Sequence, residues 1–195
     1  MEQIYTIPVN EAFEKVREDG FHVCPFCLMY NRLVDKELDL IMGASMMEPD
    51  VRLKTNELGF CGEHLSQMFE RGKRLPLALM LESHLDAIAH DLSGNMSSLF
   101  IGKTADAAVR RIEKLGKTCY ICERIEYNFT RMAETAALLW QSDPAFREKV
   151  AAAPYFCLNH YGMFIKAAHD RMSKKDFAEF YKAVSETENA YFDAL

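Results

Sequence analysis

The stretch Cys24-Pro25-Phe26-Cys27, with Phe60-Cys61-Gly62-Glu63-His64 downstream of it, decides how this chain folds. Both elements recur at nearly the same separation as Cys119-Tyr120-Ile121-Cys122 and Phe156-Cys157-Leu158-Asn159-His160. Each copy supplies three thiols and one imidazole, which is the ligand set of a closed tetrahedral zinc site. All six cysteines of the protein fall within these motifs. The sequence therefore predicts two bound Zn²⁺ ions per chain.

The simplest interpretation assigns one ion to each copy of the pattern. We expect the first ion to be held by Cys24, Cys27, Cys61 and His64, and the second by Cys119, Cys122, Cys157 and His160. Each ligand pair should lie at a helix N-terminus, where exposed N–H groups and a partial positive charge favour thiolates. The alternative is that these are buried, reduced cysteines without metal, but it leaves the duplicated spacing unexplained.

The remaining pattern is helical throughout. Apolar residues recur at helical spacing after each Cys-x-x-Cys pair, for example Ile121, Ile125, Phe129 and Met132 in the second copy. Shorter amphipathic helices are expected before the pairs, over residues 10–19 and 104–115, the second with Val109 and Ile112 on its buried face.

Proline breaks and caps delimit these helices. Asp143 and Pro144 suit the cap and the first position of a helix, and Ser173 with Asp176 forms a plausible capping box. No convincing alternating strand is found. We therefore predict an all-α tandem repeat of two roughly five-helix units, packed as one compact body. The expected ranges are residues 1–93 and 104–195, joined by a linker over 94–103.

Composition limits the function classes. An apolar fraction of 49% and a charged fraction of 27% are typical of a soluble globular protein. The formal net charge of −6 argues against non-specific nucleic-acid binding, which needs cations to neutralise phosphates. We expect no membrane span and no leader peptide. The expected compartment is the cytoplasm, where thiols stay reduced.

The paired Cys-x-x-Cys and Phe-Cys-x-x-His units resemble an uncharacterised bacterial family of unknown function. The resemblance covers nearly the whole chain, and it is carried by the eight cysteine and histidine positions named above. It implies a zinc-binding helical protein, and it implies no established activity.

Three alternatives to structural zinc remain open. Catalytic zinc needs an open coordination position, which four protein ligands do not leave. A redox role for Cys24 and Cys27 has the Cys-x-x-Cys spacing in its favour but lacks the βαβ context of thioredoxin-like motifs. An enzyme using Glu82, Asp86 and His90, which share one helix face, would need a matching cluster on a second helix.

The expected function is that of a non-enzymatic zinc-binding scaffold or a binding or regulatory module. Its partner would be another protein or a small molecule, and a homodimer is possible. The alternative is a thiol-based redox or metal-responsive regulator that uses Cys24 and Cys27.

Overall fold

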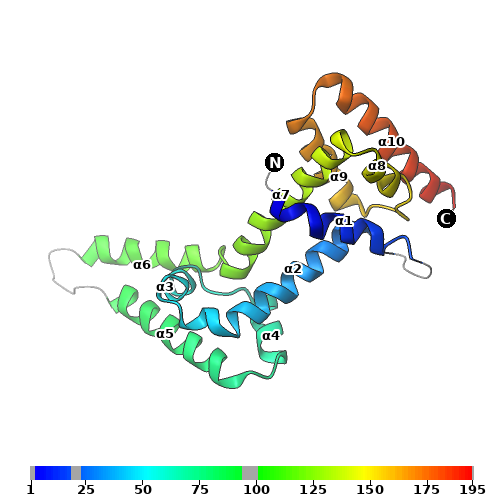
Figure 1. Cartoon of the computed structure of the whole chain (residues 1–195). Helices are drawn as coiled ribbons and strands as arrows, with labels where there is room; N and C mark the ends of the chain where they lie inside the picture. The colour runs from blue at the N-terminus through cyan, green and yellow to red at the C-terminus, as the bar shows by residue number, and fades with distance from the viewer. Residues whose placement is uncertain (1–2, 19–22, 94–100, 195) are drawn as a thin grey trace. The chain divides into compact units, whose positions relative to one another are not determined.

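The computed structural model describes residues 3–18, 23–93 and 101–194. Within these ranges it contains ten α-helices, two short 3₁₀ helices and no strand (Figure 1). The prediction of an all-α protein is confirmed. The predicted internal repeat stays a prediction.

The elements follow one another along the chain with short connections. In order they are η1 (Gln3–Tyr5), α1 (Thr6–Lys15), α2 (Pro25–Ile41), η2 (Ala44–Met47), α3 (Pro49–Leu58), α4 (Gly62–Glu70), α5 (Arg74–Ser93), α6 (Ile101–Leu115), α7 (Tyr120–Ser142), α8 (Pro144–Ala151), α9 (Leu158–Arg171) and α10 (Lys174–Asp193).

Local side-chain chemistry sets two of the helix starts as the sequence predicts. The Asp143 side chain accepts a hydrogen bond from the Ala145 N–H at 2.9 Å, and Pro144 occupies the first turn of α8. The Ser173 hydroxyl accepts from the Asp176 N–H at 3.2 Å at the start of α10. Each cap satisfies a backbone donor that has no partner within its helix.

The chain divides into two compact units that do not follow its two sequence halves. Unit 1 consists of Met1–Leu33 and Glu126–Leu195, and unit 2 consists of Val34–Ile125. Each unit thus combines residues from both predicted ranges, and α2 and α7 contribute residues to both units. Residues 94–100 of the predicted linker lie outside the described residues, and α6 begins at Ile101.

A cluster of phenylalanine rings forms the core of unit 1. Six rings are almost fully buried and come from α1, α2, α8, α9, α10 and the segment before α9: Phe13, Phe26, Phe146, Phe156, Phe164 and Phe180. Their centroids lie as close as 4.8 Å, in tilted and edge-to-face contacts. Aromatic pairs in such geometry add stabilisation beyond the apolar area that they bury.

Unit 2 has a core of aliphatic and methionine side chains, and polar groups join its helices. Buried apolar side chains include Leu38, Met42, Met68 and Met80. Within this unit α3 lies against α5, and α5 and α6 run side by side as a helical hairpin (Figure 1). On α6, Val109 and Ile112 are 54% and 56% exposed, contrary to the prediction that they face the core.

None of the helices described here is long and apolar enough to cross a membrane.

Candidate metal centres

The eight predicted ligand residues gather in two groups of four. The first cluster consists of Cys24, Cys27, Cys157 and His160, and the second cluster consists of Cys61, His64, Cys119 and Cys122. In each cluster one ligand atom per residue lies within 4.8 Å of every other. Each cluster has three sulfurs and one imidazole nitrogen, so each could hold a metal ion.

The pairing of the motifs corrects the prediction that each sequence half closes its own site. The outer two motifs of the chain meet in the first cluster, and the inner two meet in the second. The pairing is therefore nested. Each cluster takes a Cys-x-x-Cys pair from one half and a Cys-x-x-His pair from the other. This nesting matches the two units, because unit 2 consists of the inner part of the chain.

All four motifs lie at helix N-termini, as the sequence predicts. Cys24 and Cys119 immediately precede α2 and α7, while Cys61 and Cys157 are the N-cap residues of α4 and α9. The other ligand of each motif lies in the first turn of its helix. Each candidate ion would therefore lie between two helix N-termini, whose unpaired N–H groups favour the thiolate charge.

In the first cluster, the histidine presents Nδ1 to the three sulfurs. The Nδ1 atom of His160 lies 3.1 Å from Cys157 Sγ, 3.4 Å from Cys27 Sγ and 3.9 Å from Cys24 Sγ. The Sγ atoms of Cys27 and Cys157 are 3.6 Å apart.

The second cluster repeats this arrangement, and its histidine again presents Nδ1 to the three sulfurs. His64 Nδ1 lies 3.3 Å from the sulfurs of both Cys61 and Cys122, and 3.6 Å from Cys119 Sγ. The sulfurs of Cys61 and Cys122 are 3.8 Å apart.

These separations, with sulfur–nitrogen distances of 3.1 to 3.9 Å, are close to the edges of a tetrahedron around a zinc-sized ion. Bond lengths of about 2.3 Å to sulfur and about 2.0–2.1 Å to nitrogen place two sulfurs about 3.8 Å apart, and a sulfur and a nitrogen about 3.6 Å apart. The observed sulfur–sulfur distances are 3.6 and 3.8 Å. A disulfide needs sulfurs about 2.05 Å apart, and all six cysteines are free thiols.

Burial and crowding disfavour the thiolate forms of these groups unless a cation is present. Burial raises the pKa of the Cys27 thiol to about 12, and repulsion from Cys24 adds to the rise. Burial likewise raises the pKa of Cys122 to about 12, with repulsion from Cys119 as the next cause. A divalent cation reverses this balance, because it binds thiolates and repels their protons.

The surroundings of the two histidines favour the protonation state that a metal binds. Burial lowers the pKa of both His64 and His160 below the ordinary histidine value, which favours the neutral imidazole. Neutral imidazole is the ligating form.

Contacts from the core of unit 1 position the first cluster. The Phe156 N–H donates to Glu188 Oε2 at 3.0 Å, and Glu188 is only 4% exposed on α10. This bond fixes the backbone immediately before Cys157. The His160 ring packs edge-to-face on Phe129, with centroids 5.1 Å apart. Burial raises the pKa of the Cys24 thiol, and nearby backbone N–H groups, that of Cys157 foremost, oppose the rise.

The second cluster is aligned by bonds between the C-terminal end of α3 and the segment that joins α6 to α7. The Thr118 hydroxyl donates to the Leu58 carbonyl at 2.7 Å, and the Tyr120 N–H donates to the Gly59 carbonyl at 3.0 Å. These bonds hold the chain ahead of Cys61 beside the chain at Cys119. Both carbonyls would otherwise be unpaired at the helix end.

Gly59 allows the turn from α3 into the second cluster. Its φ angle of +66° lies in the region that L-residues rarely adopt. A Cβ atom there would meet His84 Nε2 at 3.0 Å.

Arg111 of α6 also supports the second cluster from a distance. Its guanidinium donates to the Asn56 carbonyl at 2.7 Å and to the Glu57 carbonyl, both in the last turn of α3. It also pairs with Asp91 of α5, Nε to Oδ2, at 2.9 Å. One side chain thus joins three helices of unit 2. Nothing in the sequence pattern marks it, because its partners are distant in the chain.

The acidic and histidine residues considered as a separate site do not form one. Glu82, Asp86 and His90 are all exposed on α5. Among the described residues, no cluster of possible metal ligands includes them. His84 of the same helix is buried instead, and its Nδ1–H donates to the Asn56 carbonyl at 3.1 Å.

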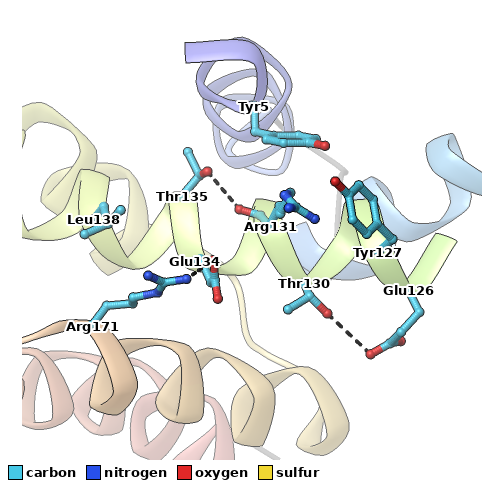
Figure 2. A pocket seen from close by; sticks show the side chains of 9 residues that line it. All are labelled: Tyr5, Glu126, Tyr127, Thr130, Arg131, Glu134, Thr135, Leu138 and Arg171. Carbon is cyan, nitrogen blue, oxygen red and sulfur yellow. Dashed lines mark hydrogen bonds and ion pairs between the residues drawn. The ribbon is translucent and has the colours of Figure 1, made fainter. Parts of the chain in front are cut away.

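A polar groove of about 570 Å³ runs along α7 in unit 1 (Figure 2). Its charged groups pair with neighbours within the groove. Arg171 lies 2.6 Å from Glu134, Nη2 to Oε2, and the Arg131 guanidinium lies 3.7 Å from the centre of the Tyr127 ring. A smaller groove of about 370 Å³ in unit 2 is mainly apolar, with Leu65, Phe69, Leu77 and Leu81 among its lining.

The chain belongs to DUF6062, a family of unknown function whose profile matches residues 1–195. Neither a curated protein nor a solved structure matches the chain. The resemblance drawn from the four motifs is confirmed at the level of the family. The family description names no activity.

Proposed function

We propose that each cluster binds one Zn²⁺ ion and that the two ions have a structural role in a non-enzymatic helical scaffold. The observation that carries this proposal is the tetrahedral spacing of three sulfurs and one Nδ1 atom in both clusters. Soft thiolates with one imidazole are typical zinc ligands.

The closed ligand sets favour a structural over a catalytic role. Four protein ligands fill a tetrahedral coordination sphere, so no position is left for a water or a substrate. Each ion would join two helix N-termini that lie far apart in the sequence. Cys27 and Cys157 are separated by 130 positions, and Cys61 and Cys122 by 61. Because closing longer loops removes more chain entropy from the unfolded state, both ions should stabilise the fold substantially.

The scaffold would bind another protein or a small molecule in a reducing compartment such as the cytoplasm. The polar groove along α7 and the apolar groove beside α4 are concave surfaces that support this role. The alternative of a redox regulator based on Cys24 and Cys27 is less favoured, because Cys24 is completely buried.

Metal content tests the proposal directly. Protein purified without chelator should contain two zinc ions per chain by elemental analysis, and native mass spectrometry should show the same mass increment. Removal of zinc with a strong chelator should abolish most of the helical circular dichroism, and added Zn²⁺ should restore it. A metal-free protein that keeps its helices would disprove the structural role.

A further inference from the structure

The two clusters differ in how far their cysteine residues are exposed. In the first cluster Cys24 is 0% exposed and Cys27 and Cys157 are half-buried. In the second cluster Cys119 is 4% exposed, but Cys122 is an exposed residue in the first turn of α7. Cys122 is thus the most exposed of the six cysteine residues, and we expect an oxidant in solution to reach it first.

The surroundings strengthen this difference. The rings of Phe26, Tyr30 and Phe129 lie within about 6.4 Å of the His160 ring, and Phe26 and Phe129 belong to the unit 1 core. No ring contact is found for His64 among the described residues. In the second cluster the sulfur of half-buried Cys61 lies only 3.8 Å from that of Cys122. A second thiol is therefore in place to react with an oxidised Cys122.

We propose that Cys122 is a modification site for hydrogen peroxide and that its oxidation to a disulfide with Cys61 releases the zinc ion of the second cluster, while the first cluster keeps its ion. This inference rests on the proposed function, since it needs zinc in both clusters. It places the reactive thiols in the second cluster, not at Cys24 and Cys27.

The reaction balances with one peroxide molecule for each disulfide. The Cys122 thiolate attacks one peroxide oxygen, the O–O bond breaks, and Cys122 becomes a sulfenic acid. The Cys61 thiolate then attacks the Cys122 sulfur, and the S–S bond forms as hydroxide leaves. The two thiolates lose two electrons, and peroxide with two protons from solvent becomes two water molecules. Of the four residues that would hold the ion, only Cys119 and His64 would then remain as ligands.

The test uses the full-length protein after its two zinc ions have been counted. Hydrogen peroxide is added at one equivalent per chain, and released zinc is followed with a chromogenic chelator. We expect one zinc ion to be released at least about tenfold faster than the other, because oxidation follows thiolate exposure. Differential alkylation and peptide mapping should locate the disulfide at Cys61 and Cys122, with Cys24, Cys27 and Cys157 still reduced.

Two matched variants separate the clusters. C122H keeps a zinc ligand but removes the accessible thiol, so peroxide should no longer release a zinc ion rapidly. C27H makes the same change of ligand type in the first cluster, and rapid release of one ion should persist. If either variant fails to retain two ions, the alkylation pattern of the unaltered protein decides alone.

Failure of this inference can be told apart from failure of the proposed function. Fewer than two zinc ions before peroxide is added contradicts the proposed function. Two bound ions that are released at equal rates, or first oxidation at Cys24 and Cys27, overturn the inference and leave the structural role intact.

Discussion

Glu188 shows how one buried side chain can fix a candidate metal site from another helix. Its carboxylate accepts the Phe156 N–H next to Cys157, and both residues are almost fully buried. Truncation to alanine leaves a buried backbone donor without a partner, whereas glutamine retains a carbonyl oxygen that can accept this bond.

We therefore expect E188A to lower the free energy of unfolding by about 1–3 kcal/mol, and E188Q to lower it clearly less. Urea denaturation of zinc-loaded protein provides the measurement. Equal losses in the two variants would show that the carboxylate does not act through the Phe156 N–H.

His84 gives unit 2 a dependence on pH that is separate from its metal ligands. Burial lowers the pKa of His84 below its ordinary value of 6.5, and the hydrogen bond to the Asn56 carbonyl only partly opposes this shift. The unfolded chain therefore takes up a proton at a higher pH than the folded chain does. The associated stability is present above pH 6.5 and is lost as the pH falls below it.

The expected result is that H84Q loses less stability than the unaltered protein between about pH 7.5 and about pH 5.5. Both proteins keep the same candidate metal ligands, so any loss of metal at low pH should affect them equally. The free energy of unfolding of each protein is measured at several pH values. The same dependence on pH in both proteins would contradict a titrating role for His84.

The sequence predicts the individual candidate ligands, but it does not predict the residues that hold their backbone in place. The eight candidate ligands follow from residue type and spacing, because Cys-x-x-Cys and Cys-x-x-His motifs carry their chemistry locally. Glu188, Arg111 and Thr118 act on backbone groups that are distant in the chain, and a single sequence offers no signal for such contacts.

The helices of unit 2 show where periodicity fails. The stripe Leu81, Leu85, Ile88 on α5 predicts an apolar buried face, but Leu85 is 62% exposed while Met80 and His84 are buried. The reason is that α3 packs on the side of α5 that carries Met80 and His84. There Arg52, Ser83 and His84 make hydrogen bonds between α3 and α5. Helix starts were easier to predict, since caps such as Ser173 depend only on adjacent residues.

Arg111 and Ile112 on α6 provide a test at the scale of the element. Periodicity places Ile112 in the core and Arg111 outside, whereas the Arg111 side chain is only 13% exposed and Ile112 is 56% exposed. We expect R111A to destabilise the protein by about 1–3 kcal/mol, because two α3 carbonyls lose a charged donor.

The matched substitution I112Q should change stability by no more than about 0.5 kcal/mol, as is usual for exposed positions. Both variants are compared by urea denaturation with zinc present. A larger loss of stability in I112Q than in R111A would show that Ile112 faces the core and Arg111 faces solvent, as periodicity predicts.

For the whole chain, the nested pairing is the main feature that the sequence could not supply. A sequential pairing and a nested pairing of the four motifs would both give each cluster three cysteines and one histidine. Only tertiary contacts decide between them, such as the bond between Tyr120 N–H and the Gly59 carbonyl. The nested pairing also explains why unit 2 is an internal segment of the chain, Val34–Ile125.

Zinc counts in two double variants test the nested pairing most directly. C27S/C157S removes two ligands from one cluster, whereas C27S/C61S removes one ligand from each. Native mass spectrometry should find one zinc ion per chain in C27S/C157S and none tightly bound in C27S/C61S. The reverse result, with the ion retained only in C27S/C61S, would contradict the nested pairing and show that each sequence half closes its own site.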